Sequence, residues 1–327
     1  MYVDSYEQSG QREKRREEWR ERERERERET ESETEERSYL LHNPKNKYLQ
    51  IERMEFPKTH IHHPQTPHTH TVILLHGRGS DGPEFAEELF SSSTSKNKNL
   101  PSCLPSYRWV FPTSRDRWST TFEEEMCAWF DAYSLGNIYE RQELQKEGIR
   151  ESVLYILNTL EEEARLLDGR FSHIYLGGMS QGMATALWAF FAATATGRIQ
   201  GPLGGLFGFC GWLPFAQQLE QLLSGLSLSP GSSQTQSLIS GFFFDEIAGD
   251  TLRSDQPVDC SILSTPVFLS HGADDPWVSV ELGRQACQVL RKIMVRVDWQ
   301  EFTGAEGDGH WVKEPEGFDR ILQFLEG

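Results

Sequence analysis

The sequence predicts an α/β fold in which a mainly parallel central sheet is flanked by helices on both faces. Short apolar runs alternate along the chain with longer segments whose apolar residues recur at helical spacing. The apolar runs are almost continuously hydrophobic, which is typical of parallel strands that are buried on both faces. With 327 residues, the chain is long enough for one such domain and a sizeable core.

Each predicted strand is a short apolar run that turn residues follow. The strands are expected at residues 71–76, 107–112, 173–176, 203–210, 266–271 and 295–302. An additional edge strand is expected near residues 48–56.

The predicted helices follow from apolar stripes and from their position after strands. Residues 141–166 give the longest, because Ile149, Val153, Ile156 and Leu160 form one apolar stripe. Shorter helices are expected at residues 83–89, 183–191 and 315–325.

The stretch from Gly178 to Gly182 has the pattern G-x-S-x-G between a predicted strand and a predicted helix. This context indicates a nucleophile elbow, a sharp turn that exposes Ser180 above the sheet. Glycines on both sides let the backbone turn tightly and pass close to its neighbours. The amide of Gln181 would lie at a helix N-terminus, where an oxyanion can be stabilised.

An acid and a histidine follow in the chain order that this architecture requires. Asp274 and Asp275 come directly after the predicted strand 266–271, and His310 lies in a glycine-rich loop after the strand 295–302. A serine becomes nucleophilic beside a base, and the base needs a group that orients it. Ser180, Asp275 and His310 are therefore the predicted catalytic triad.

These residues lie in blocks that resemble the phospholipase/carboxylesterase family of α/β-hydrolases, the group that contains the acyl-protein thioesterases. The resemblance spans about residues 70 to 327 and keeps the family's order. The matching blocks are residues 74–82, 126–131, 178–182, 211–214, 271–278 and 309–310.

The resemblance implies an α/β-hydrolase fold and a serine carboxylesterase or acyl-thioesterase that needs no metal or organic cofactor. It favours Asp275 over Asp274, because the family's acid directly precedes the proline. The backbone amides of Arg78 and Gln181 would form the oxyanion hole. The family usually has an apolar residue at the position of Arg78, so this side chain is expected to influence which acyl or head groups are accepted.

The resemblance also implies an apolar acyl-binding channel near the matching blocks. Trp129, Trp212 and Trp277 lie in those blocks and are expected to bind substrate, with core packing as the alternative role. The expected substrates are acyl esters or thioesters, with S-acylated proteins, lysolipids and small alcohol esters as open alternatives.

Two other functions remain as alternatives at this point. The loop from Gly77 to Gly82 matches G-x-G-x-x-G, which would suit a nucleotide-dependent oxidoreductase, but no acid and no strand follow at the required distance. A non-catalytic binding protein on the same fold is the other alternative. A fluorophosphonate probe separates both from a hydrolase, because it labels only an activated serine.

Residues 1–40 form a charged low-complexity tail with too few apolar residues to bury a core, and we expect it to be disordered. Residues 41–70 form a histidine- and proline-rich lead-in, whose spacing fits no zinc motif. The catalytic domain is expected at residues 71–327, with a flexible insertion at about 217–260. That insertion is rich in Ser, Gln and Gly.

The net negative charge of the chain indicates which binding partners are expected. Residues 1–40 hold 10 basic and 14 acidic side chains of the chain's 33 and 50, which leaves 23 and 36 in the remainder. An acidic domain is expected to repel nucleic acid and anionic membranes. The five scattered cysteines and the lack of a signal peptide, spanning segment or lipidation motif predict a cytoplasmic protein without a stable membrane anchor.

Overall fold

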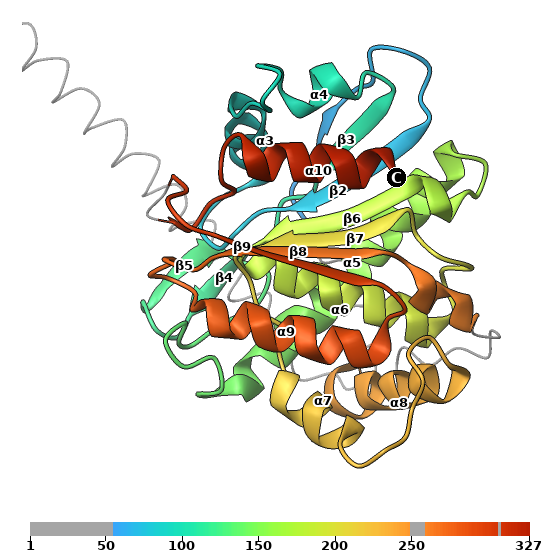
Figure 1. Cartoon of the computed structure of the whole chain (residues 1–327). Coiled ribbons are helices and arrows are strands. Elements are labelled where there is room, and N and C mark those ends of the chain that lie inside the picture. The colour runs from blue at the N-terminus through green and yellow to red at the C-terminus, as the bar shows by residue number, and fades with distance from the viewer. Residues whose placement is uncertain (1–54, 249–258, 307–308) are drawn as a thin grey trace, which may run out of the picture. The chain divides into compact units, whose positions relative to one another are not determined.

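The computed structural model describes residues 55–248, 259–306 and 309–327, and the chain from Phe56 to Gly327 forms one compact unit. A seven-stranded sheet crosses this unit, and every neighbouring pair of its strands is parallel except the first. Figure 1 shows the sheet between two layers of helices. In sheet order the strands are β1 (His60–His62), β3 (Tyr107–Phe111), β2 (His70–Leu75), β6 (Ile174–Met179), β7 (Gly205–Phe209), β8 (Val267–Gly272) and β9 (Val297–Phe302).

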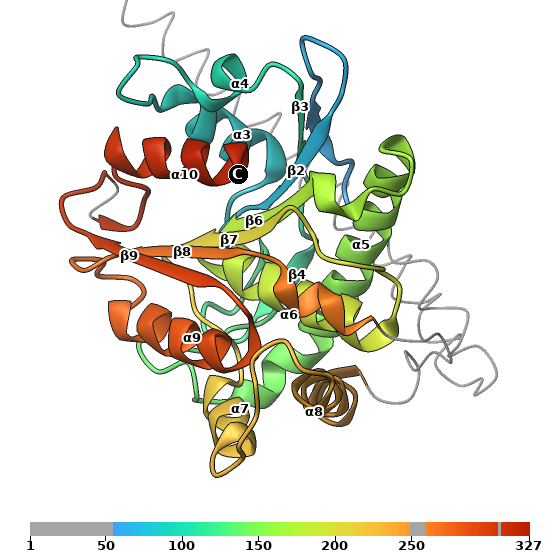
Figure 2. The ribbon, with the colours of Figure 1, turned by 45° about the vertical axis from the view of Figure 1, so that its right-hand side comes forward.

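One face of the sheet is covered by helices that contribute to the larger core cluster, and the other by three helices that share a second cluster. The first group is α5 (Gln145–Leu166), α6 (Gln181–Thr196), α7 (Ala216–Leu223), α8 (Ser233–Phe243) and α9 (Val280–Ile293). The second group is α3 (Gly82–Ser91), α4 (Leu100–Cys103) and α10 (Glu316–Glu326). Figure 2 shows the same two layers from another direction.

The sequence-based prediction of a mainly parallel sheet with helices on both faces is confirmed. All six strands expected in residues 71–302 are present, with ends shifted by up to three residues. The strand interiors are buried in β2, β6, β7 and β8, which explains why their sequences are mainly apolar. Helix α6 is buried along its whole length between the sheet and other helices.

The edge strand lies at His60–His62, where it pairs antiparallel with β3. The sequence placed it near residues 48–56, of which 48–54 lie outside the described residues. Part of the lead-in therefore belongs to the sheet. The tail at 1–40 also lies outside the described residues.

Within the predicted flexible insertion at about 217–260, the structure has the helices α7 and α8, joined by a turn at residues 224–232. Leu219, Leu223, Ile239 and Phe243 are buried in the larger core cluster. A spacing of four residues puts each pair of side chains on the inner face of α7 or α8, so both helices are held by apolar packing. Residues 249–258 of the same predicted insertion lie outside the described residues.

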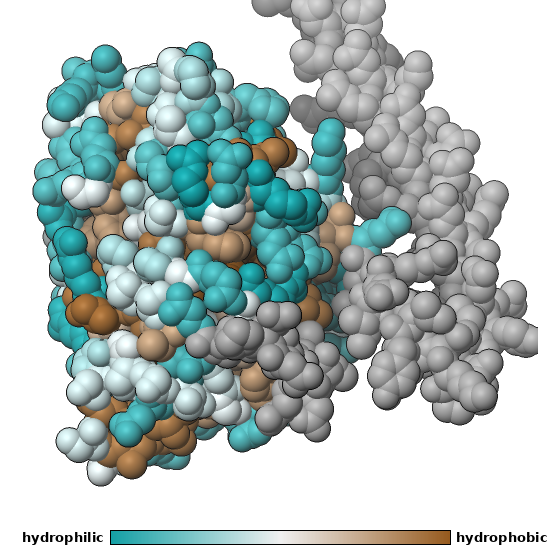
Figure 3. Space-filling view, turned by 90° about the vertical axis from the view of Figure 1, so that its right-hand side faces the viewer, coloured by the Kyte–Doolittle hydropathy of each residue, from teal (hydrophilic) through white to brown (hydrophobic). Residues whose placement is uncertain are grey.

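A small antiparallel hairpin stands apart from the main sheet. It consists of β4 (Asp116–Ser119) and β5 (Glu124–Cys127). Within the described residues, no helix is long and apolar enough to cross a membrane. The space-filling view in Figure 3 shows apolar and polar side chains intermixed on one face of the molecule.

Candidate active site

Ser180 lies between the end of β6 and the start of α6, at a strained turn. Its backbone angles are φ 53° and ψ −120°, and residues other than glycine rarely adopt such a positive φ. A Cβ atom on Gly178 would overlap the carbonyl of Gly182, and one on Gly182 would overlap the carbonyl oxygen of Leu75. Both glycines of G-x-S-x-G are therefore required for the turn to pass this close to β2.

His310 and Asp275 form a short polar contact in the site. The Nδ1 atom of His310 lies 2.6 Å from Oδ2 of Asp275, whose side chain is fully buried. The backbone amides of Trp277 and Val278 donate to the other carboxylate oxygen, at 2.9 and 3.0 Å. Burial by itself would raise the pKa of Asp275, but hydrogen bonds from His271, His310 and the Val278 amide hold it well below its ordinary value. The carboxylate is thus ionised and oriented toward His310.

Asp274 faces a different group from its neighbour. Its Oδ2 atom accepts a hydrogen bond of 2.7 Å from the amide of Gly304, in the turn after β9. This contact leaves Asp275 as the carboxylate that pairs with His310, in agreement with the preference drawn from Pro276.

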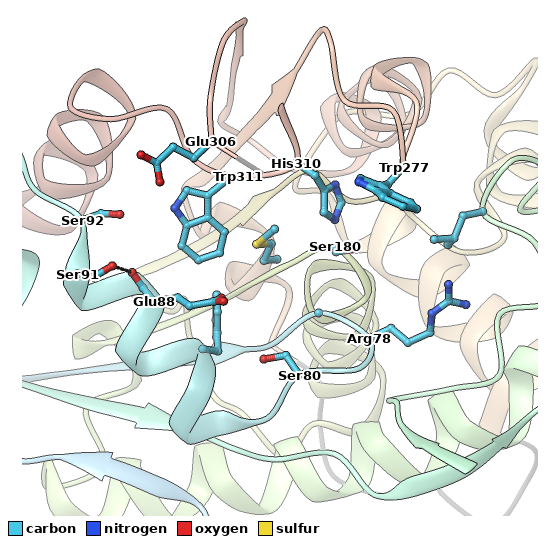
Figure 4. A pocket seen from close by; sticks show the side chains of 14 residues that line it. Arg78, Ser80, Glu88, Ser91, Ser92, Ser180, Trp277, Glu306, His310 and Trp311 are labelled. Carbon is cyan, nitrogen blue, oxygen red and sulfur yellow. Dashed lines mark hydrogen bonds between the residues drawn. The ribbon is translucent and has the colours of Figure 1, made fainter. Parts of the chain in front are cut away.

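Ser180 and His310 both line a cavity of about 530 Å³. Figure 4 shows His310 above Ser180, between Trp277 on one side and Trp311 on the other. Apolar side chains line much of the wall, among them Phe85, Leu135 and Met179. A nucleophile, its base and an apolar space thus occur in one pocket.

The loop after β2 approaches Ser180 from the other side. A Cβ on Gly77 would lie 3.6 Å from Cβ of Ser180, so Arg78 follows directly after the point of contact. The amide of Gly79 donates to the carbonyl oxygen of Cys127 at 2.8 Å, which ties this loop to β5. The backbone amides of Arg78 and Gln181 therefore lie on the two segments that flank the serine.

The side chain of Arg78 contacts Ala132 and Phe122. Its Nη1 atom donates to the carbonyl oxygen of Ala132 at 3.2 Å, and the guanidinium lies 5.0 Å from the ring centre of Phe122. Figure 4 shows this side chain extending away from Ser180 and His310. The geometry favours a role in holding the hairpin β4–β5 against the loop.

The three tryptophans expected to bind substrate have different environments. Trp277 lines the cavity with 61% of its surface exposed. Trp129 and Trp212 are fully buried and do not line it. The Trp129 indole donates to the carbonyl oxygen of His76, and Trp212 packs edge-on against Phe130. The expectation of substrate contact therefore does not hold for Trp129 and Trp212, whose rings pack beneath the site.

Sequence reasoning missed several residues that line the cavity. Trp311 could have been found, because it directly follows His310. Phe85 and Leu135 carry no local signal, since they lie on α3 and on a loop that only the fold brings to the pocket. Their polar neighbours in the wall are Ser80, Glu88, Ser91, Ser92 and Glu306.

The glycine pattern of the loop from Gly77 to Gly82 has a packing explanation. A Cβ on Gly82 would overlap the carbonyl oxygen of Phe111, so this glycine lets α3 begin close against β3. Gly79 has φ 86°, which favours glycine in this turn. The pattern thus arises without a dinucleotide.

One group among the described residues has the spacing of metal ligands. It comprises Cys210, His271 and Asp275, whose ligand atoms lie within 4.8 Å of one another. Both oxygens of Asp275 already accept hydrogen bonds. We therefore assign this group to hydrogen bonding around the carboxylate.

A mainly parallel sheet with a serine at the β6–α6 turn is the arrangement of the α/β-hydrolases. The crystal structure of acyl-protein thioesterase 2 from Zea mays shares this fold with a TM-score of 0.53, at 23% identity, over 82% of this chain and 97% of that one. The sequence model of the phospholipase/carboxylesterase family matches residues 57–230. The chain belongs to this family of hydrolases.

Curated relatives extend the match beyond residue 230. The chain is 28% identical to acyl-protein thioesterase 1 of Gibberella zeae over 264 residues, which cover 79% of this chain and 90% of that protein. It is 26% identical to acyl-protein thioesterase 1 of Yarrowia lipolytica, over 72% of this chain and 84% of that protein.

Proposed function

We propose that this chain is a serine hydrolase that cleaves carboxylic esters and thioesters, with Ser180 as nucleophile, His310 as base and Asp275 as the acid that orients His310. The observation that carries the proposal is the 2.6 Å contact between His310 and the buried Asp275, beside a cavity that Ser180 shares. The names of the curated relatives support acylated proteins as substrates.

In the proposed mechanism, Asp275 holds Nδ1–H of His310, so Nε2 is free to accept a proton. Nε2 takes the proton from Ser180 as Oγ attacks the acyl carbonyl carbon. The backbone amides of Arg78 and Gln181 would stabilise the negative oxygen of the tetrahedral intermediate. His310 then gives the proton to the departing alcohol or thiol, and an acyl-enzyme remains on Ser180.

Water completes the reaction by the same route in reverse. His310 accepts a proton from water, the hydroxide attacks the acyl-enzyme, and Ser180 recovers its proton as the carboxylic acid leaves. The apolar side chains of Phe85, Leu135, Met179, Trp277 and Trp311 are suited to the hydrocarbon part of an acyl group. All five cysteines are free thiols, which supports a reducing compartment such as the cytoplasm.

The proposal is tested with a fluorophosphonate probe and with p-nitrophenyl esters and acyl thioesters of increasing chain length. We expect the full chain to be labelled and to hydrolyse both ester types. Ser180→Ala should abolish labelling and turnover while the melting temperature stays close to that of the parent. Absence of labelling in the parent chain, or turnover by the Ser180→Ala variant, would contradict the assignment.

A further inference from the structure

A second histidine contacts the carboxylate of Asp275, and the mechanism above does not use it. His271 is the residue before the end of β8, and its side chain is buried. Its Nε2 atom lies 2.9 Å from the carbonyl oxygen of Val278 and 3.2 Å from Oδ2 of Asp275. A carbonyl oxygen only accepts hydrogen bonds, so Nε2 carries a proton that lies between these two oxygens.

The opposite edge of the His271 ring is held by packing. Nδ1 has no hydrogen-bond partner in the described part of the chain. A Cβ on Gly283 of α9 would lie 2.5 Å from this nitrogen and 2.7 Å from the ring of Trp299. A proton on Nδ1 would be buried without an acceptor, which is costly. The ring is therefore fixed with its single proton directed at Asp275 and Val278.

Two other titratable groups lie near His271, and neither competes with Asp275 for the hydrogen bond from its Nε2. Burial raises the pKa of the Cys210 thiol to about 12, so Cys210 stays neutral beside Asp275. On β9, Glu301 is held by Arg284 and by the indole of Trp299. Asp275 is thus the anion that receives the His271 hydrogen bond.

Val278 links the two residues into a closed ring. Its amide donates to Oδ1 of Asp275 at 3.0 Å, and its carbonyl oxygen accepts from Nε2 of His271 at 2.9 Å. Oδ1 also accepts from Trp277, and Oδ2 accepts from His310. With donors on both oxygens, the carboxylate plane has one orientation available, in which Oδ2 faces His310.

We propose that His271 is a positioning residue, which fixes the carboxylate of Asp275 so that Oδ2 meets Nδ1 of His310. This inference rests on the proposed roles of Asp275 and His310. His271 touches no reacting atom. It acts through Asp275: without its hydrogen bond, Oδ2 keeps only the contact to His310, so the carboxylate can tilt about the Cβ–Cγ bond while the Trp277 and Val278 amides still hold Oδ1.

The first test compares two substitutions of His271. Leucine removes the donor, whereas glutamine keeps an amide N–H at about the reach of Nε2. We expect His271→Leu to lower kcat by about 10- to 100-fold, the scale of a misplaced catalytic group, with KM changed by less than about two-fold. His271→Gln should recover most of that loss. Retention of the parent kcat by a folded His271→Leu variant would overturn the proposal.

The second test displaces the imidazole ring of His271 while keeping its Nε2–H donor. Gly283→Ala puts a methyl group against Nδ1 from α9, so it should lower kcat in the same way as His271→Leu. Gly241→Ala is the matched control, because Gly241 also lies in a helix but faces open space. Equal kcat values for the two alanine variants would count against the proposal, and a loss confined to Gly283→Ala would support it.

A spectroscopic readout separates this inference from the proposed function. The proton between His310 and Asp275, across 2.6 Å, should give a strongly downfield ¹H NMR resonance. We expect this resonance in the parent, in Ser180→Ala and in His271→Gln, and its upfield shift or loss in His271→Leu. The measurement needs no turnover, so an inactive parent chain would refute the proposed function while the resonance still decides the role of His271. An unchanged resonance in His271→Leu would overturn the positioning role.

Discussion

Asp274 and Asp275 are adjacent in the chain but bind different partners. Asp275 accepts from His310, while Asp274 accepts from the amide of Gly304. The backbone turn after β8 directs one carboxylate inward and leaves the other exposed. The two positions thus provide an internal comparison with nearly identical chemistry.

We predict that Asp275→Asn lowers kcat by about 10⁴-fold, because an amide would hold His310 in the wrong tautomer. Asp274→Asn should change kcat by less than about five-fold, since it loses only a contact to an exposed turn. Steady-state kinetics on a p-nitrophenyl ester measures both. The opposite ranking would show that Asp274 orients His310.

His76 is a buried histidine at the start of the loop after β2. Its Nδ1 atom donates to the carbonyl oxygen of Gly77 at 2.6 Å, and Nε2 accepts from the amide of Ser114 at 3.0 Å. Both nitrogens are satisfied in the neutral ring. Burial lowers the pKa of His76 from 6.5 to about 4, so protonation is disfavoured in the folded state.

This shift predicts a loss of stability in weak acid. Between about pH 6.5 and 4 the unfolded chain binds a proton at His76 and the folded chain does not, so the free energy of unfolding falls as the pH falls through this window. The shift corresponds to about 3 kcal/mol at full extent. Urea denaturation at several pH values measures the slope. His76→Gln should reduce the dependence of the free energy of unfolding on pH. An unchanged dependence in this variant would mean that other groups cause it.

At the scale of whole elements, a buried strap of hydrogen bonds made by Gln181 and Trp129 joins the loop after β2 to α6. Oε1 of Gln181 accepts from the amide of Trp129 at 2.9 Å, and Nε2 donates to the carbonyl oxygen of Phe130 at 2.8 Å. The indole of Trp129 in turn donates to His76 at 2.9 Å. The first residue of α6 therefore sets the position of the segment directly after β5, and Cys127 at the end of β5 accepts from the amide of Gly79.

We expect Gln181→Ala to lower kcat by about ten-fold or more with a small change in KM, because its backbone amide remains but the strap is released. Gln236→Ala is a suitable control. Gln236 is a buried glutamine of α8 whose side chain donates to Thr194 on α6, away from the cavity. The control should lose stability without losing kcat. If both variants lost kcat equally, the strap would have no special role.

For the whole molecule, we predict that the charged tail at residues 1–40 is not needed for function. All residues assigned to the proposed site fall between Arg78 and Trp311. Residues 1–40 contain none of them and are rich in charge. Strand β1 is different, since it pairs with β3 in the sheet.

We predict that removal of residues 1–40 leaves esterase activity and melting temperature unchanged. Removal of residues 1–63 should lower the melting temperature, because it deletes β1 and exposes the edge of β3. Thermal unfolding and ester hydrolysis of the two shortened chains check both statements. A large loss on removing residues 1–40 would mean that the charged segment docks on the domain.

The sequence by itself predicted six strands of the main sheet, the four helices α3, α5, α6 and α10, the parallel sheet, the turn at Ser180 and the family, but not α4, α7, α8, α9 or the hairpin β4–β5. These features depend on local patterns, such as apolar runs, the glycines of G-x-S-x-G and their order along the chain. The roles proposed for Ser180, Asp275 and His310 also came from such patterns, and the described geometry is compatible with them.

Only the tertiary structure decided which side chains meet. It put Trp129 and Trp212 in the core, brought Phe85 and Trp311 to the cavity, packed α7 and α8 onto the core and placed His271 against Asp275. Each of these outcomes depends on where a side chain points and which distant segment packs against it. Tryptophans in matching blocks are equally apolar whether they face a pocket or a core, so their composition could not separate the two. The distinction arises from contacts between residues far apart in the chain, which hydrophobic burial and hydrogen bonding select together.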